Sequence, residues 1–184
     1  MIVVGILTRY LGPAGFGHDS AIFAYLFIFT ALADLGLYTV LVREISKDGI
    51  RESSVASKIF TLRLFVVVGL IIIADMLVFV FPYPLLVKLG VLIASLSSLF
   101  SSLAQVLTGI FQKYLRVYLI SLSDVIARLV QVSALVLLVH FETGLLWFVG
   151  VVILSGIVNF SLVFHFARTL VPVKLNIDWG YWGK

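Results

Sequence analysis

The stretch that decides the fold is Leu145–Ala167, which reads LLWFVGVVILSGIVNFSLVFHFA and contains no Asp, Glu, Lys or Arg. A membrane-spanning α-helix needs about 20 consecutive, mostly apolar residues to cross about 30 Å of hydrocarbon. Four further stretches have the same character, namely residues 20–42, 59–81, 85–110 and 118–139. These runs are longer and more uniformly apolar than the alternating strands of about ten residues in a membrane β-barrel. The sequence therefore predicts an all-α integral membrane protein.

The composition of the 184-residue chain agrees with a membrane location. Hydrophobic residues make up 62% of the sequence and charged residues only 12%, whereas soluble domains are roughly 45–50% apolar and about 25% charged. A soluble chain of this size buries only about 70% of its extended surface, so it would expose much apolar surface to water. We therefore exclude a soluble enzyme, a nucleic-acid-binding domain and a disordered tail. The sequence has no cysteine, and hence no disulfide framework or thiolate metal site.

Both ends of the chain read as parts of membrane spans. Residues 1–12 are apolar but would reach only about 18 Å as a helix, so we interpret them as the second half of a truncated first helix. A Gly-Pro pair and two further glycines predict a turn over Gly12–Asp19. Residues 169–184 are amphipathic and aromatic, and we interpret them as a cytoplasmic lead-in to a missing seventh span. The expected architecture is thus a six-helix transmembrane bundle, with the sixth span over residues 145–167.

The distribution of Lys and Arg predicts the orientation, because short cytoplasmic loops carry an excess of basic residues. If the first helix runs outward, the outer segments hold two basic residues, Arg9 and Lys88, and Arg128 lies inside a span. We therefore predict a multi-pass protein of the cytoplasmic (inner) membrane, with both chain ends directed toward the cytoplasm. The inner segments hold the other ten basic residues: Arg43, Lys47, Arg51, Lys58, Arg63, Lys113, Arg116, Arg168, Lys174 and Lys184.

The span over residues 118–139 carries polar side chains on one face. Ser121, Asp124, Arg128 and Gln131 are spaced by three, four and three residues, which aligns them along a helix. An ionised side chain at mid-bilayer costs at least about 2.5–3.5 kcal/mol, so it must face the bundle interior or a water-filled cavity. Two interpretations are compatible: a neutralising Asp124–Arg128 pair packed against another helix, and a cationic site on a substrate path.

A longer polar stripe runs along the span over residues 85–110. Ser98, Ser101, Gln105, Thr108 and Gln112 follow a spacing of three, four, three and four. Small and hydroxylated residues allow membrane helices to pack closely, so the stripe is either a helix–helix seam or the wall of a water-filled cavity. Polar faces on several helices favour a bundle that encloses a hydrophilic lumen.

Three other spans contain isolated polar residues. Asp34 shares a face with Thr30, about two turns from the inner end of its span, where it would couple transport to an ion or cap a neighbouring helix. For Asp75 we favour a structural or interfacial role. Asn159 lies one turn after Ser155, and we expect both to form hydrogen bonds between helices.

The sequence contains no motif for covalent or energy-converting chemistry. It has no Walker-type phosphate loop, no Asp-Asp pair, no His-Glu-x-x-His motif and no Gly-x-Ser-x-Gly nucleophile elbow. His18, His140 and His165 lie near span ends and do not cluster, so we expect no metal site. We therefore predict a passive or ion-coupled transporter that is not an enzyme and uses no cofactor.

Two stretches near the start of the chain resemble a known family. The first is RYLGPAGFG at Arg9–Gly17, and the second is LADLGL at Leu32–Leu37, which is followed by VREI at Val42–Ile45. In this order, about 20 residues apart on a multi-span chain, they resemble the start of the oligosaccharide flippases of the polysaccharide transporter family. That family includes O-antigen flippases and shares a superfamily with the multidrug and toxin exporters, so the chain is MATE-like in this sense.

The resemblance implies a fold of two six-helix lobes that face each other across a central cavity. It makes residues 1–184 the N-terminal lobe and the missing C-terminal lobe its partner. The implied function is the flipping of an undecaprenyl-pyrophosphate-linked oligosaccharide across the lipid bilayer by alternating access, during the biosynthesis of polysaccharides such as the O-antigen of lipopolysaccharide. No nucleic acid is implied as a partner.

The resemblance also implies roles for the polar residues in the spans. Arg128 would contact the pyrophosphate, since arginine binds phosphate oxygens in a bidentate manner, and Arg9 would act near the outer mouth. The further candidates are Gln105, Gln131 and Asn159 for substrate binding, and Asp34 and Asp124 for coupling or gating.

Two alternative functions stay open. A multidrug or cation antiporter of the same superfamily would use Asp34 as an ion-coupling carboxylate in an acidic cavity, against which Arg128 argues. A non-transporting membrane scaffold would use the polar stripes only as packing seams. Cysteines placed at Ser98, Ser101 and Gln105 would react with water-soluble thiol reagents only if these positions line a lumen.

Overall fold

The computed structural model describes residues 2–34, 36–46, 51–141 and 144–175, and over these ranges it contains six α-helices and no strand. Five stretches are long and apolar enough to cross a membrane: Gly12–Ile45, Glu52–Leu77, Leu85–Lys113, Tyr118–His140 and Leu145–Leu170. The predicted class of an all-α membrane bundle is thereby confirmed. The helices are α1 (Ile2–Asp34), α2 (Leu37–Ile45), α3 (Glu52–Leu77), α4 (Leu85–Lys113), α5 (Tyr118–His140) and α6 (Leu145–Leu170).

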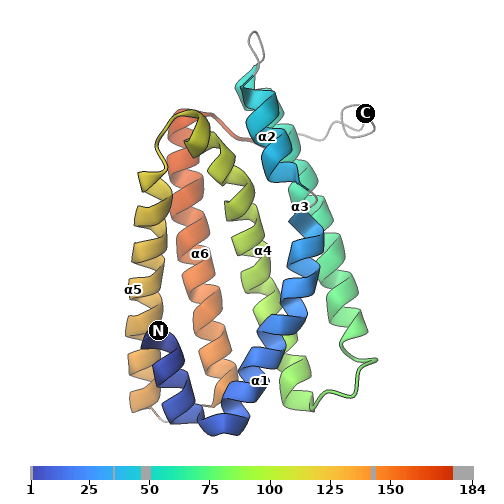
Figure 1. The fold of residues 1–184 in the computed structure, drawn as a ribbon, viewed down its shortest axis with the longest axis vertical. Helices are drawn as coiled ribbons and strands as arrows, with labels where there is room; N and C mark the ends of the chain where they lie inside the picture. Colours follow the sequence, from blue (N-terminus) through green and yellow to red (C-terminus); the bar gives the residue numbers. More distant parts are fainter. Residues whose placement is uncertain (1, 35, 47–50, 142–143, 176–184) are drawn as a thin grey trace.

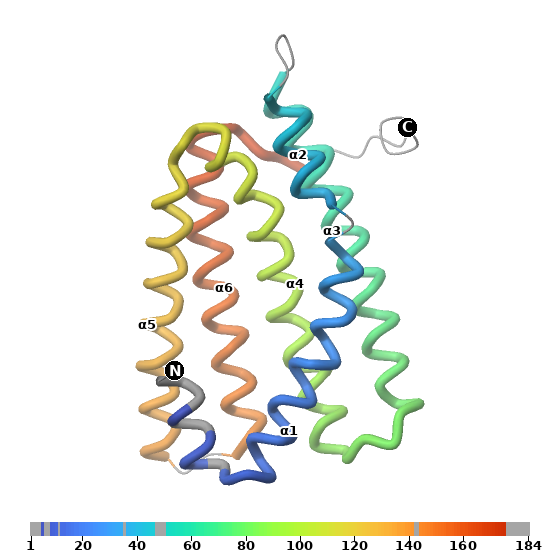
Figure 2. Tube along the Cα trace, in the orientation of Figure 1, coloured from blue at the N-terminus to red at the C-terminus, as the bar shows by residue number. Residues whose placement is uncertain are grey.

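The helices run along the long axis of the molecule, and α3 to α6 alternate in direction (Figure 1). Helix α4 is central, since it packs against α1, α2, α3 and α6, and α6 also packs against α5. Figure 2 traces α5 and α6 along one side of the bundle and α3 along the other. This arrangement leaves one face of α4 and α5 without a covering helix, and the polar residues lie there.

The turn expected over Gly12–Asp19 is wrong, because a single residue reverses the chain. Gly12 has φ 68° and ψ −179°, and the helix resumes directly after it. A positive φ favours glycine, and Pro13 suits the first turn of the following helix because its missing N–H would have no partner there. The part of α1 before Gly12 folds back onto α5 and α6, where the rings of Tyr10 and Phe148 lie 5.3 Å apart.

The single span expected over residues 20–42 is interrupted. Helix α1 ends at Asp34 and α2 begins at Leu37, after Gly36 with φ 71° and ψ 12°. The Gly36 carbonyl accepts hydrogen bonds from the Thr39 hydroxyl (2.6 Å) and the Val40 amide (3.0 Å), which start the new helix. The break leaves the last carbonyl groups of α1 without partners inside that helix.

Apolar packing forms two main clusters along the bundle. One joins α2 to the first half of α3 and the last turns of α4 and α6, with Ile45, Ile59 and Phe111 fully buried. The other joins α1, α3 and α4 near the opposite end, around Ile22 and Val91. Helix α3 starts at Glu52, earlier than the expected span at residue 59, because its first turns pack into the first cluster.

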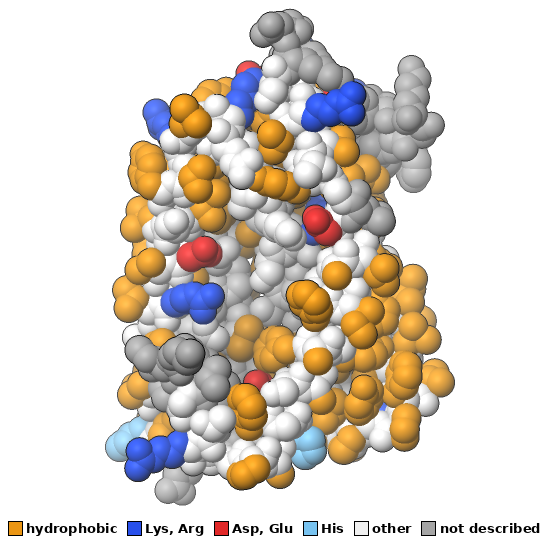
Figure 3. Space-filling view, in the orientation of Figure 1, with side chains coloured by type: hydrophobic (Ala, Val, Ile, Leu, Met, Phe, Trp, Pro, Cys, Tyr) orange, Lys and Arg blue, Asp and Glu red, His pale blue; other side chains and the backbone are white. Residues whose placement is uncertain are grey.

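The outer surface is largely apolar, as expected for contact with lipid. Large hydrophobic side chains such as Phe27, Phe65 and Leu129 are exposed, and such side chains cover the flanks of the molecule in Figure 3. We call the end of the bundle that carries α2 the basic end. Arg63, which the structure describes, does not lie at this end. The other described cationic residues that were expected on the inner side do lie there, namely Arg43, Arg51, Lys58, Lys113, Arg116, Arg168 and Lys174.

Some of the expectations fall outside the described part of the chain. Lys47 belongs to residues 47–50, and the lead-in over residues 169–184 is described only to Leu175. In the described segment after α6, the backbone amide of Lys174 donates to the Ser57 hydroxyl at 2.9 Å. The chain after α6 is therefore fixed against the first turns of α3.

Three side chains, which we call the basic-end clamp, tie α2, α3 and α4 together. Lys113 Nζ donates to the carbonyl of Ile45 and to Glu52 Oε1, at 2.5 Å from the latter. The Tyr114 hydroxyl donates to Glu52 Oε2 at 2.6 Å. Because this hydrogen bond to a carboxylate stabilises the protonated phenol, it raises the pKa of Tyr114.

Candidate functional site

A cleft of about 340 Å³ opens between α4, α5 and α6 on the uncovered face. A second hollow of about 490 Å³ continues it toward α1 and shares Ser97, Ser101 and Gln105 with it. The two polar stripes predicted on residues 85–110 and 118–139 thus meet across one groove. Figure 3 shows the face hollowed there, beside acidic and basic side chains that lie over α5. The polar lining consists of Ser97, Ser101, Gln105, Thr108, Asp124, Arg128, Gln131, Ser155 and Asn159.

Close packing of small residues positions the two walls of this cleft. The Ser97 hydroxyl donates to the Val152 carbonyl at 3.3 Å. A Cβ added to Gly156 would lie 3.2 Å from Ser97 Oγ, which is a tight contact, so glycine at this position favours the close approach of α6 to α4. Ser101 and Gln105 of the predicted stripe form a cleft wall, while the seam with α6 is made by Ser97, which lies outside that stripe.

The acidic and basic residues of α5 have different partners from those expected. Asn159 Nδ2 donates to Asp124 Oδ1 at 2.7 Å, which ties α6 to α5. Arg128 makes no hydrogen bond or ion pair with any residue that the structure describes, and it is exposed at the cleft. The expected neutralising Asp124–Arg128 pair is therefore wrong, and the guanidinium of Arg128 is available to a ligand.

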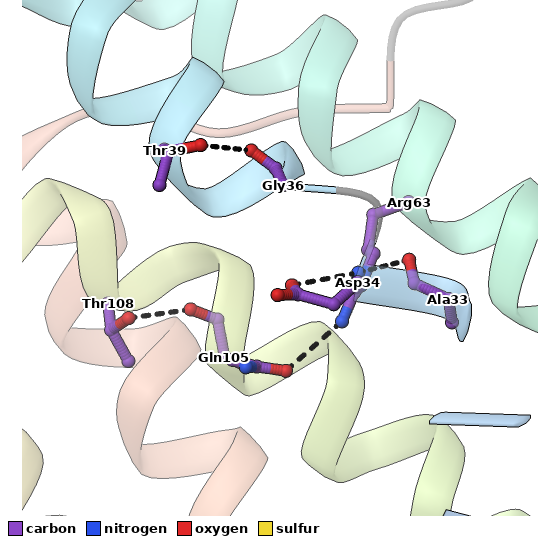
Figure 4. A network of polar contacts seen from close by, with 7 residues as sticks. All are labelled: Ala33, Asp34, Gly36, Thr39, Arg63, Gln105 and Thr108. Carbon is purple, nitrogen blue, oxygen red and sulfur yellow. Dashed lines mark hydrogen bonds and ion pairs between the residues drawn. The ribbon is translucent and has the colours of Figure 1, made fainter. Parts of the chain in front are cut away.

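A second polar centre lies where α1 breaks, and it is drawn in Figure 4. Arg63 of α3 is completely buried there. Its Nη1 donates to the carbonyl of Ala33 and to Asp34 Oδ1 (3.3 Å), and its Nη2 donates to Gln105 Oε1 (3.1 Å). The Ala33 carbonyl needs such a partner because the helix that would have bonded it ends one residue later.

The position of Arg63 corrects the sequence analysis, which counted it among the cations of the inner segments. It lies inside α3 within the bundle and forms an ion pair with Asp34. The sequence did contain a signal for this ion pair, because Asp34 and Arg63 both lie a few turns from the inner ends of consecutive spans. Opposite charges at similar depths of neighbouring membrane helices indicate a pair.

The structure brings most of the predicted site residues together. Asp34 reaches the groove indirectly, through Arg63 and Gln105. Arg9 is exposed in the first part of α1 and is not a lining residue of either hollow. The candidate site residues that line the cleft are Arg128, Gln105, Gln131, Asn159 and Asp124.

Comparison with known proteins gives one match. A family model described as "Polysaccharide biosynthesis protein" matches residues 1–176. No curated protein and no solved structure matches the chain.

Proposed function

The chain belongs to the polysaccharide biosynthesis protein family, and we propose that it moves a lipid-linked oligosaccharide across the cytoplasmic membrane. Family membership and five candidate spans make it a multi-pass membrane protein with a role related to polysaccharides. The specific proposal is that the substrate is an undecaprenyl-pyrophosphate-linked oligosaccharide, as in the assembly of O-antigen.

The physical task favours a polar groove at the edge of an apolar bundle. The lipid tail of such a substrate stays in hydrocarbon, but its sugar hydroxyls and pyrophosphate must cross a layer without water. A polar group that loses its hydrogen bonds in an apolar medium costs several kcal/mol. A groove with amides, hydroxyls and a cation replaces water along the path.

The observation that carries the proposal is the guanidinium of Arg128, which lies at the cleft and pairs with no residue in the described part of the chain. Arginine offers a fork of donors that matches phosphate oxygens. Gln131 lies one turn further along α5 on the same wall, and Asn159 lines the cleft from α6, beside Asp124. We propose that Arg128 binds the pyrophosphate and that the amides bind sugar or phosphate oxygens.

Asp124 is the proposed gating residue. Its hydrogen bond with Asn159 joins α5 to α6 across the cleft. Movement of these two helices would stretch or break that bond. The cleft is open on one side, which fits the proposal that a facing six-helix lobe covers it and that the two lobes rock about the site.

The pairing of Asp34 with Arg63 weighs against cation antiport. An ion-coupling carboxylate must be available to the ion, but Asp34 Oδ1 already accepts from a buried guanidinium. Because a cation already lies beside Asp34, this carboxylate is better explained as part of a structural or gating contact. Arg128 adds a further positive charge to the groove.

Binding of farnesyl pyrophosphate to the protein in lipid nanodiscs tests the proposal, with farnesol as the uncharged control ligand. We expect the pyrophosphate to bind more tightly than farnesol, and Arg128→Ala to weaken it at least about tenfold, since hydrogen bonds to charged groups contribute about 1.5–3 kcal/mol. Arg116→Ala removes the same charge from the loop after α4 and should leave binding unchanged.

Two results would contradict the proposal. Equal affinity for farnesol and farnesyl pyrophosphate would exclude a pyrophosphate site. Unchanged binding by Arg128→Ala would remove that residue from the site.

A further inference from the structure

We infer that Arg63 is a positioning residue of the cleft: it fixes the side-chain amide of Gln105 so that the NH₂ group, and not the oxygen, is offered to the substrate. The inference rests on the proposed function, because it assumes a substrate rich in oxygen acceptors. It assigns a role in recognition to a residue that does not line the cleft itself.

The chemistry of the two groups determines the orientation of the amide. A guanidinium has only donors, so Gln105 must turn its oxygen toward Arg63. Nη2 of Arg63 lies 3.1 Å from Gln105 Oε1. The planar amide then directs its nitrogen to the opposite side, away from Arg63 (Figure 4). Within the described part of the chain, this nitrogen has no hydrogen-bond partner.

Arg63 can act in this way because it cannot easily rotate. It is completely buried, and its two terminal nitrogens are held by Ala33, Asp34 and Gln105, which belong to two different helices. Rotation of the guanidinium would break these contacts inside the bundle. The ion pair with Asp34 thus anchors Arg63, and Arg63 orients Gln105.

The cleft needs this amide because most of its hydroxyl donors are already used. The Thr108 hydroxyl donates to the Gln105 backbone carbonyl at 2.6 Å, and the Ser155 hydroxyl donates to the Ala127 carbonyl at 3.2 Å. Ser97 donates to Val152, as described above. Apart from the Ser101 hydroxyl, the donors left for a phosphate or sugar oxygen are Arg128 and the side-chain amides.

The Gln105→Glu variant tests whether the side-chain NH₂ group of Gln105 contributes to substrate binding or whether Gln105 only supports the fold. A carboxylate at this position keeps the contact with Arg63 and strengthens it, so the thermal stability should stay equal or rise. It replaces the NH₂ group with an oxygen, however, and farnesyl pyrophosphate should bind at least about tenfold more weakly. Because the added carboxylate also repels the pyrophosphate, weaker binding supports the positioning role only together with the Arg63→Lys result, whereas binding equal to that of the wild type contradicts it.

Arg63→Lys tests the residue that does the positioning. A lysine keeps the charge beside Asp34, but it lacks the fork that also reaches Gln105. We expect farnesyl pyrophosphate to bind about threefold to tenfold more weakly, the range of one net hydrogen bond. In the Gln105→Leu background, the same Arg63→Lys change should have little further effect on binding.

A spectroscopic measurement tests the orientation without a ligand. With ¹⁵N-labelled glutamine, the wild type should give one well-resolved pair of side-chain NH₂ signals that disappears in Gln105→Leu. In Arg63→Lys this pair should broaden or move, because the amide is free to turn over. An unchanged pair would overturn the inference.

The outcomes distinguish the two proposals. If the wild type does not bind farnesyl pyrophosphate more tightly than farnesol, the proposed function fails, while the NMR result still decides the orientation. If the wild type binds but Gln105→Glu and Arg63→Lys bind equally well, the positioning role fails and the proposed function stands.

Discussion

At the scale of single residues, burial of the Arg63 guanidinium carries a large electrostatic cost for the fold. Removing a guanidinium from water is expensive unless every nearby acceptor is well placed. Arg63 is completely buried, whereas the side chain of its partner Asp34 is 41% exposed. The two members of the pair therefore differ in how well water can replace a lost partner.

This difference predicts unequal effects of the two single substitutions. Asp34→Ala leaves a buried cation without its counter-ion and should lower the free energy of unfolding by about 3–5 kcal/mol. Arg63→Met leaves a carboxylate that water can reach, so it should cost less. Reversible unfolding in mixed micelles measures both.

The double variant serves as the control for this prediction. Arg63→Met combined with Asp34→Ala removes both charges and should be more stable than Asp34→Ala alone. If Asp34→Ala were as stable as the wild type, the ion pair would not contribute as described.

The residue scale is also where sequence analysis has its clearest limit. The spacing on α5 predicted which of its residues share a face, because three- and four-residue periods follow directly from helix geometry. It did not predict that Asp124 bonds Asn159 of α6 or that Arg63 bonds Asp34 of α1, since contacts between helices depend on rotation and depth. Counting basic residues placed Arg63 in an inner segment because it lies near the start of its span.

At the scale of helices, glycines set both the direction of the chain and its closest contacts. The expected span over residues 118–139 and helix α5 (Tyr118–His140) nearly coincide, whereas α1 departs most from expectation. A glycine with positive φ needs only one residue to redirect a helix, and sequence patterns do not distinguish this from a longer loop. Among the described residues, Gly12 and Gly36 are the glycines with positive φ.

The seam between α4 and α6 yields a matched pair of substitutions on one helix. Gly150→Ala should stabilise the protein by about 0.5–1 kcal/mol, because its Cβ meets nothing within 4 Å and alanine favours the helix. Gly156→Val should destabilise it by about 1–3 kcal/mol, because Ser97 lies in the way. Thermal unfolding in detergent measures both changes. A Gly156→Val variant as stable as the wild type would contradict the close contact between α4 and α6.

At the scale of the whole molecule, exposed surface has two kinds of surroundings. Leu129 on α5 is 62% exposed on the apolar exterior, and Ser101 is exposed in the polar groove. We expect the first to face lipid and the second to face water in a bilayer. The distinction decides between a substrate path and a scaffold with packing seams.

Cysteine labelling tests this distinction, and the natural chain has no cysteine of its own. With a charged thiol reagent, Ser101→Cys should react rapidly in proteoliposomes. Leu129→Cys should not react, because hydrocarbon excludes the reagent, and Ser123→Cys should not react, because Ser123 is fully buried. A Ser101→Cys variant as slow as Ser123→Cys would favour the scaffold.

The reversal at Gly12 also bears on how the protein is made. The segment before Gly12 is synthesised before α6, yet its Tyr10 packs against Phe148 of α6, which follows much later in the chain. Tyr10 therefore stays without this aromatic partner until α6 has been synthesised. A contact that holds the reversed segment of α1 thus forms only after the last described helix has been made.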